Sequence, residues 1–173
     1  MDLRSSPISG GLKGEYQPPS DKSISHRLAM LGAVTAGTTQ IHAFLDSADT
    51  IATAKAMAAL GAEIDWKHES RGWTLTIRGG RLAPPVAALD FGNSGTGMRL
   101  GAGLLAGMGA QLGSATTPIE LVGDASLSRR PMERIVAPLL RQGAKIESTE
   151  GHAPLFVQPT VLQGSAHELK VAS

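Results

Sequence analysis

Residues 38–48, Thr-Thr-Gln-Ile-His-Ala-Phe-Leu-Asp-Ser-Ala, repeat the pattern of residues 116–126, Thr-Thr-Pro-Ile-Glu-Leu-Val-Gly-Asp-Ala-Ser. Two further pairs of segments recur in the same order, at 22–27 with 94–99 and at 61–64 with 143–146. The separation between the paired segments drifts by only a few residues, as expected for loop insertions. Internal repetition of this kind indicates the architecture before any single helix or strand is assigned.

The first copy, at about residues 18–80, predicts alternating strands and helices. Apolar side chains recur at helical spacing at Ile24, Leu28, Leu31 and Val34. The expected elements are a strand before Pro18-Pro19, a helix over 22–36, a strand over 38–45, a helix over 47–60, and a hairpin of 62–66 with 73–78.

The second copy, at about residues 84–160, predicts the same order. The expected elements are a strand over 86–91, a helix over 96–108, a strand over 119–122, a helix from near Pro131 to Gln142, and strands over 144–148 and 155–158. Pro131 suits the first turn of its helix, whereas Pro138 is expected to kink that helix or delay its start.

The repeat predicts an α/β (α+β) fold of βαβαββ units, with two complete units and the start of a third at about residues 167–173. A unit that cannot cover its own apolar face needs neighbours. We therefore expect the chain to be the front part of a longer protein. The alternative is a complete domain of two units with an irregular tail.

Composition limits the classes of function. The chain has 173 residues, of which 42% are hydrophobic and 18% charged, as in a folded globular domain. A net charge of +1 and only 3% aromatic residues argue against a nucleic-acid or membrane partner. The chain has no cysteine, which excludes thiolate chemistry, and its first residues lack the apolar core of a signal peptide. These features fit a cytoplasmic protein.

Lys22, Ser23 and Arg27 lie at the expected start of the first helix. Free backbone N–H groups and the helix dipole attract anions at such a position. Lysine adds a point charge, and arginine a planar fork that suits phosphate or carboxylate. The alternative is a serine-capped helix with solvated charges. His26, taken alone, is assigned no role.

Asn93, Gly95 and Arg99 belong to the corresponding turn of the second copy, within the sequence Gly-Asn-Ser-Gly-Thr-Gly-Met-Arg of residues 92–99. Its glycines allow the backbone to approach a ligand closely. A tight turn alone would explain the glycines, but it would not explain why Arg99 occupies the position that Arg27 has in the first copy.

A third turn carries Arg129 and Arg130, with Ser128 as the expected helix cap. Arginine at a helix start is unfavourable by about 0.3–1 kcal/mol unless an anion offsets it. Its recurrence at three helix starts favours an anion site. Asp46 and Asp49 could act as paired carboxylates, although helix capping is the preferred interpretation. The five histidines show no metal-ligand spacing, so no metal site is expected.

Together these turns resemble those of the enolpyruvyl transferase family, and the resemblance covers nearly the whole chain. It is carried by residues 21–27, by residues 92–99, and by Gly123-Asp124-Ala125 with Arg129-Arg130-Pro131-Met132. The closer similarity is to the members that act on shikimate 3-phosphate. The family's fold implies two domains, each of three βαβαββ units, so the second domain would be absent here. Ser20 departs from the family, which usually has glycine at that position.

The resemblance implies transfer of the enolpyruvyl group of phosphoenolpyruvate to the 5-hydroxyl of shikimate 3-phosphate, with release of phosphate, in the shikimate pathway of aromatic amino acid and chorismate biosynthesis. It implies that Lys22 touches both substrates and that Ser23 and Arg27 hold shikimate 3-phosphate. It implies that Asn93 and Gly95 lie against phosphoenolpyruvate, and that Arg130, with help from Arg99, clamps the anionic groups of phosphoenolpyruvate. It also implies that Ser173 begins the next substrate-binding motif. No catalytic acid or base is expected in this half, in which Lys22 has at most an electrostatic role. No cofactor is expected.

Two alternatives remain. One is the sister enzyme that transfers enolpyruvate to UDP-N-acetylglucosamine, which typically uses a loop cysteine that this chain lacks. The other is a non-catalytic anion-binding module that pairs with a separate polypeptide. The resemblance implies that the acid–base residues come largely from a missing C-terminal half, so the isolated chain is expected to be inactive or nearly so.

Overall fold

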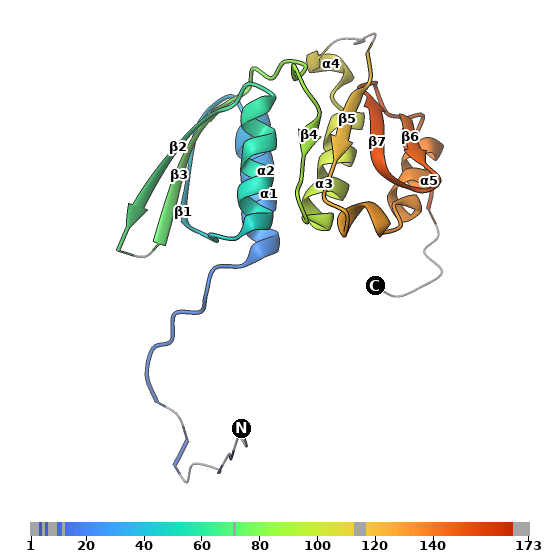
Figure 1. Cartoon of the computed structure of the whole chain (residues 1–173). Helices are drawn as coiled ribbons and strands as arrows, with labels where there is room; N and C mark the ends of the chain where they lie inside the picture. The colour runs from blue at the N-terminus through green and yellow to red at the C-terminus, as the bar shows by residue number, and fades with distance from the viewer. Residues whose placement is uncertain are drawn as a thin grey trace.

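The computed structural model describes residues 4, 6, 10, 11, 13–70, 72–112 and 117–167 of the chain. Two groups of helices and strands lie side by side, each with its own sheet (Figure 1). The α/β fold class is therefore confirmed. The order of elements follows the repeat, with helix, strand, helix and a two-stranded hairpin in each group.

The first sheet has three antiparallel strands in the order β1-β3-β2. These strands are β1 (Gly37–Phe44), β2 (Glu63–Glu69) and β3 (Gly72–Gly79). The helices α1 (Lys22–Val34) and α2 (Ala48–Ala59) pack beside it. Gly79 permits a close approach, because a Cβ atom there would lie 2.1 Å from the carbonyl oxygen of Gly32 in α1.

The second sheet has four strands in the order β4-β5-β7-β6. Its strands are β4 (Leu89–Asp90), β5 (Ile119–Val122), β6 (Lys145–Thr149) and β7 (His152–Gln158). Strand β4 pairs parallel to β5, and the other pairs are antiparallel. The helices of this group are α3 (Gly95–Ala106), the short α4 (Gly109–Leu112), the 3-10 helix η1 (Leu127–Arg129) and α5 (Glu133–Arg141).

Several predicted boundaries are wrong. The strand expected before Pro18-Pro19 does not form within residues 13–21, where neither proline has the N–H that a sheet ladder requires. The strand predicted over 86–91 shortens to β4. Pro138 lies inside α5, which starts at Glu133, two residues after Pro131 and thus near the predicted point. The third unit predicted at 167–173 falls almost wholly outside the described residues.

The apolar spacing of α1 does not mark its buried side. Ile24, Leu28 and Leu31 are 59%, 37% and 58% exposed. The residues of α1 that are buried are mostly small, and they are Ser25, His26, Ala29, Met30, Gly32 and Ala33. Small side chains let α2 and α3 approach closely, so the close-packed side of α1 carries the shorter residues. The longer apolar residues remain uncovered within the described part of the chain.

Candidate functional site

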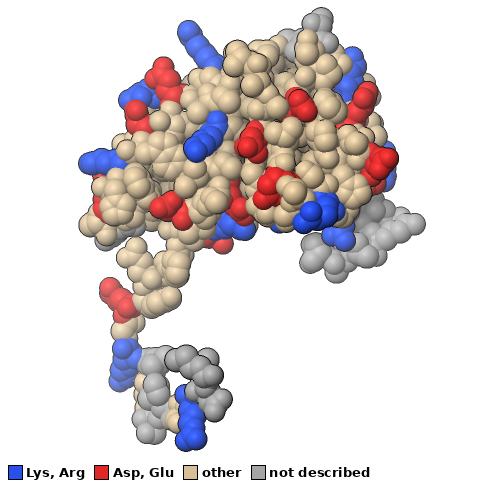
Figure 2. All heavy atoms as spheres, in the orientation of Figure 1, with Lys and Arg blue, Asp and Glu red and all other residues tan. Residues whose placement is uncertain are grey.

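The three turns singled out from the sequence lie at one end of the molecule. Strands β4 and β5 run parallel, so the turns that follow them emerge at the same edge of the second sheet. The start of α1 lies at that same end, which is the lower end in Figure 1. The charge of the surface is mixed, since Figure 2 shows lysine and arginine interspersed with acidic residues on the visible face. Local placement, not overall charge, must define any anion site.

The start of α1 is ordered by its own cap and by contacts with neighbouring elements. Asp21 accepts a hydrogen bond from the backbone N–H of Ile24 at 2.7 Å. The Nζ of Lys22 lies 2.9 Å from the Oδ2 of Asp49, which belongs to the first turn of α2. Lys22 remains half exposed, with 50% of its side-chain surface accessible. Its ammonium group is therefore available to an anion that approaches this end.

Arg27 and Arg99 adopt equivalent positions, as the repeat predicts. The guanidinium of Arg27 donates to the carbonyl oxygen of Ser23 at 3.0 Å, four residues earlier in α1. The guanidinium of Arg99 donates to the carbonyl oxygen of Gly95 at 3.3 Å, again four residues earlier in α3. Both side chains therefore fold back over the first turn of their own helix. This brings each positive charge to the end where the backbone N–H groups are free.

Gly95 lies beneath two guanidinium groups. A Cβ atom at this position would be 2.9 Å from an Nη1 atom of both Arg99 and Arg130. Arg130 also donates to the side-chain oxygen of Asn93, whose amide nitrogen donates to Asp124 at 2.8 Å. The structure thus brings together four of the predicted residues, namely Asn93, Gly95, Arg99 and Arg130.

Arg134, which belongs to none of the three turns predicted from the sequence, joins this group. It lies four residues after Arg130, on the first turn of α5, and lines a cleft of about 500 Å³ together with Arg99, Arg130, Pro131 and Ile135. Burial, and then the like charges of Arg130 and Arg134, lower the pKa of Arg99. Among the described residues, no carboxylate forms an ion pair with any of the three arginines. A volume of this size suits a small-molecule ligand.

The third turn differs from its prediction. Ser128 does not cap a helix; its hydroxyl donates to the carbonyl oxygen of Gly123 at 3.4 Å. Asp124 instead accepts from the backbone N–H groups of Ser126 and Leu127, at the start of η1. Hydrogen bonds from the N–H of Leu127, from Asn93 and from the N–H of Ser126, aided by the charge of Arg130, lower the pKa of Asp124. Asp124 is thus an ionised anchor for this turn.

Asp46 and Asp49 do not act as paired carboxylates, and of the two candidate caps of α2, Asp46 and Ser47, it is Ser47 that caps the helix. Ser47 caps α2 in a capping box with Thr50. Asp46 accepts from the indole N–H of Trp73 at 3.0 Å, whereas Asp49 pairs with Lys22. The carboxylates therefore serve different partners, because the tight turn before α2 directs them to different neighbours.

The predicted residues form two groups. Lys22, Ser23 and Arg27 lie at the start of α1, whereas the arginine group lies at the starts of α3 and α5. No described hydrogen bond joins the two groups directly. Ser173, expected to begin a further binding motif, lies outside the described residues. The two groups are related through α2 and its contacts with α1 and α3.

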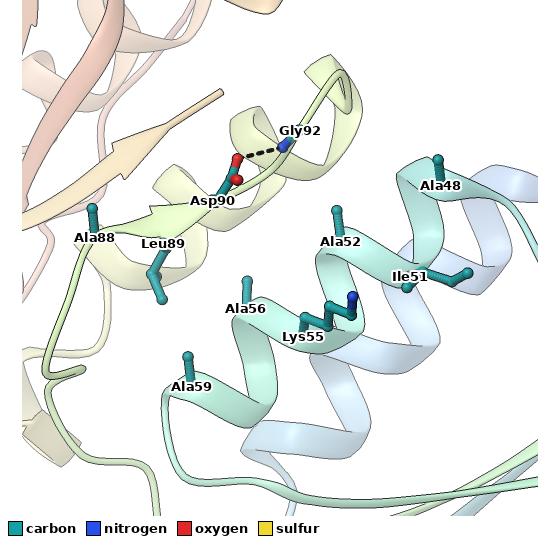
Figure 3. Close-up of a pocket in the computed structure, with 10 residues that line it drawn as sticks. All are labelled: Ala48, Ile51, Ala52, Lys55, Ala56, Ala59, Ala88, Leu89, Asp90 and Gly92. Atoms are coloured by element: carbon teal, nitrogen blue, oxygen red, sulfur yellow. Dashed lines mark hydrogen bonds between the residues drawn. The ribbon is translucent and has the colours of Figure 1, made fainter. Parts of the chain in front are cut away.

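A second hollow lies between α2 and β4 and contains none of the predicted residues (Figure 3). It has a volume of about 490 Å³, and half of its lining residues are alanines, most of them in α2. The polar side chains on it are Lys55 and Asp90, and Asp90 already accepts from the N–H of Gly92 at 2.7 Å. This lining offers little chemistry.

Searches of the described residues for two other kinds of feature found none. No cluster of three or more histidine, cysteine or acidic side chains could hold a metal ion in the described part of the chain. Within the same residues, no helix combines the length and apolar character required to cross a membrane.

Comparison with known proteins identifies relatives that are named 3-phosphoshikimate 1-carboxyvinyltransferase. The chain is 49% identical over 171 residues to 3-phosphoshikimate 1-carboxyvinyltransferase of Alkalilimnicola ehrlichii, and 45% identical over 166 residues to that of Lactiplantibacillus plantarum. These matches cover 95% and 94% of this chain, but only 36% of the length of each relative.

A solved structure of EPSP synthase from Acinetobacter baumannii superposes with a TM-score of 0.78 at 40% identity, covering 92% of this chain and 35% of that one. The family model described as EPSP synthase (3-phosphoshikimate 1-carboxyvinyltransferase) matches residues 7–173. The chain therefore belongs to the EPSP synthase family.

Proposed function

We propose that this chain supplies substrate-binding residues to an enzyme that transfers the enolpyruvyl group of phosphoenolpyruvate to the 5-hydroxyl of shikimate 3-phosphate. The observation that carries the proposal is the convergence of Arg99 and Arg130 above Gly95, without a carboxylate partner among the described residues. Both substrates are polyanions, and guanidinium groups bind phosphate and carboxylate in a bidentate manner. The relatives' names favour the shikimate enzyme over the one that uses UDP-N-acetylglucosamine. A cytoplasmic location is part of the same proposal.

The two groups of residues would bind mainly different substrates. Lys22, Ser23 and Arg27 would hold shikimate 3-phosphate, with Lys22 also reaching phosphoenolpyruvate. Asn93, Gly95 and Arg130 would hold phosphoenolpyruvate, with Arg99 assisting. Asn93 orients Arg130 and is itself oriented by Asp124, so the guanidinium is held in place before the anion binds. Such preorganised charges stabilise a transition state more effectively than charges that must move into place.

The reaction requires proton transfers that this chain is not expected to perform. The substrate hydroxyl loses a proton as its oxygen bonds to the central carbon of phosphoenolpyruvate, and the methylene carbon gains one; the intermediate then loses a proton and phosphate. These steps need a general acid and a general base. Because the chain spans 36% of the relatives' length, we assign those roles to the remaining part.

Two surfaces support a partner that completes the first unit. The first is the uncovered apolar row of Ile24, Leu28 and Leu31 on α1. The second is β1, an edge strand, whereas the corresponding β5 has the parallel strand β4 beside it. Unpaired strand edges and apolar helix faces favour association. We propose that the remaining part of the relatives' length covers both.

Binding and turnover can be tested separately. Phosphoenolpyruvate and shikimate 3-phosphate are titrated into the ¹⁵N-labelled chain, and backbone amide shifts are followed at Ser23 and Gly95. We expect saturable shifts in the unsubstituted chain and a loss of the phosphoenolpyruvate response at Gly95 in Arg130→Ala. Arg141→Ala, at the opposite end of α5, is the matched control. An unchanged response in Arg130→Ala would contradict the assigned site.

Turnover is measured as release of inorganic phosphate when both substrates are present. We expect no release by the isolated chain, and release once the remaining part of the Alkalilimnicola ehrlichii relative is added. Robust release by the isolated chain would contradict the assignment of acid–base residues to the other part. Substrate binding without release in the mixture would instead indicate a non-catalytic anion-binding module.

A further inference from the structure

A buried histidine links the helices that carry the proposed site. His26 is completely buried in α1, and its Nδ1 lies 2.8 Å from the Oγ1 of Thr53 in α2. One turn nearer the helix starts, Lys22 pairs with Asp49. One turn further on, Met30 and Met57 are both buried. Each pair is separated by 27 residues in the sequence, so α1 and α2 pack in register along this row.

The same threonine lies against the third helix. A Cβ atom at Gly97 of α3 would lie 2.5 Å from the Oγ1 of Thr53 and 2.7 Å from the Oγ of Ser94. Ser94 is buried and caps α3 by accepting from the N–H of Gly97 at 3.0 Å. His26 and Thr53, in the second turns of α1 and α2, therefore lie against the first turn of α3. The proposed substrate-binding residues lie close by, in the turn of α1 before His26 and in the first turn of α3.

The hydrogen bonds fit the tautomer of His26 that carries its proton on Nδ1. The single hydroxyl proton of Thr53 can be donated to the carbonyl oxygen of Asp49 at 3.3 Å, as is common for threonine within a helix. The Oγ1 then accepts from Nδ1–H of His26. The Nε2 atom is buried without a hydrogen-bond partner among the described residues. In the other tautomer the unpaired group would be Nε2–H and not a lone pair, and buried N–H groups without a partner are rarer than acceptors without one.

The environment also opposes a charged imidazole. Burial lowers the pKa of His26, and the positive charges of Lys22 and Arg27 lower it further, against the opposing effect of Asp49. A neutral ring can remain in this position at neutral pH, where a second positive charge beside Lys22 would be unfavourable. His26 thus differs from Lys22 and Arg27, which face the anion with their charges.

We propose that His26 is a positioning residue, which through Thr53 holds the anion-binding starts of α1 and α3 at a fixed separation. His26 itself does not touch the substrates. The inference rests on the proposed function, because it concerns residues that act on the same anions. It predicts that the hydrogen bond from Nδ1, not the volume or charge of the ring, is what the site requires.

The test compares variants of His26 and Thr53 by titration with inorganic phosphate, monitored by amide shifts at Ser23 and Gly95. His26→Asn places an amide nitrogen at the Nδ1 position, whereas His26→Leu fills the space without a donor. We expect affinity within about twofold of the unsubstituted chain for asparagine and about tenfold weaker for leucine, a typical coupling for a residue outside the ligand shell. All titrations are performed well below the unfolding temperature of each variant.

Thr53 supplies an independent arm. Thr53→Val removes the Oγ1 but keeps the shape, and Thr53→Ser keeps the hydroxyl as the matched control. We expect Thr53→Val to weaken phosphate binding as His26→Leu does, and the double variant to be no weaker than either one, because both remove the same link. If His26→Leu does not fold, the Thr53 variants still test the proposal. Nitrogen shifts of the imidazole should show the neutral Nδ1–H form, even below the ordinary histidine pKa of about 6.5.

The outcomes separate the two proposals. If the unsubstituted chain binds no phosphate, the proposed function fails, and the role of His26 fails with it. If it binds phosphate but His26→Leu or Thr53→Val binds equally well, only the role of His26 is refuted. Equal weakening by His26→Asn and His26→Leu would also refute it, since the Nδ1 hydrogen bond would then not be the cause.

Discussion

Gly97 provides a sharp test of how closely α3 packs against α2. Replacing glycine with alanine inside a helix usually stabilises it by about 1 kcal/mol. At Gly97, however, the new Cβ atom would lie 2.5 Å from the Oγ1 of Thr53, 2.7 Å from the Oγ of Ser94 and 3.1 Å from a ring carbon of Phe91. All three neighbours are completely buried, so they have little room to move. Overpacking of this kind costs about 1–3 kcal/mol.

Gly103 in the same helix is the matched control. A Cβ atom there would meet nothing within 4 Å. Gly103→Ala should therefore show the helix gain alone, of about 1 kcal/mol. The difference between the two variants isolates the packing cost, so Gly97→Ala should be less stable than Gly103→Ala by about 1–3 kcal/mol.

The assay for this pair is urea unfolding followed by circular dichroism, with the free energy of unfolding compared at equal m-value. Gly97→Ala should also weaken phosphate binding, because it displaces Thr53, whereas Gly103→Ala should leave binding unchanged. Equal stability of the two variants would show that α3 does not approach α2 as closely as described. Reduced stability with intact phosphate affinity would place the contact outside the proposed site.

Three further predictions concern charge, pH and surface. Arg134→Ala should weaken phosphate binding several-fold, because it removes one of the three guanidinium groups that line the arginine cleft, and Arg134→Lys should weaken binding less. If calorimetric titration gave Arg134→Ala the same phosphate affinity as the unsubstituted chain, Arg134 would not belong to the site. Asp124 has a lowered pKa in the folded chain, so its ionised form stabilises the fold above the unfolded-state pKa of about 3.9 and this contribution is lost as pH falls through the folded-state value. The urea midpoint of Asp124→Asn should accordingly lie below that of the unsubstituted chain at pH 7, with the gap closing below about pH 4; a gap independent of pH would contradict this. Leu31→Glu, on the uncovered row of α1, should leave the unfolding free energy of the isolated chain unchanged within about 0.5 kcal/mol. It should, however, abolish phosphate release when the remaining part of a relative is added. Unimpaired phosphate release in that mixture would show that the row is not covered.

The repeat in the sequence predicted the order of elements well, because each copy carries its own local signals. Helical spacing, strand alternation and the glycines at turns act over a few residues, and they recur in both copies. The helices assigned to 96–108 and 47–60 therefore agree closely with α3 and α2, and the strand at 119–122 coincides with β5. Capping was harder to predict, because several neighbouring side chains can perform it. Ser47 caps α2 where Asp46 was also eligible, and Asp124, not Ser128, accepts the backbone N–H groups at the start of η1.

The candidate site was predicted in part. Arginine at equivalent positions of two copies was visible in the sequence, and the structure adds that both side chains fold back over the first turn of their helices. Arg134 was missed, although its spacing of four from Arg130 was a usable signal. His26 was set aside because a single histidine has no pattern. Its importance depends on Thr53, which is 27 residues away in the sequence.

The sequence by itself determined the family, the α/β class and the positions of the cationic turns, because these follow from short motifs and their repetition. Only the tertiary structure decided which face of α1 is buried, which carboxylate meets Lys22, and that His26 lies at the junction of three helices. The physical reason is that burial and pairing depend on how closely helices approach one another. That distance is set by small residues such as Gly97 on a neighbouring helix, and no periodicity within a single segment records it.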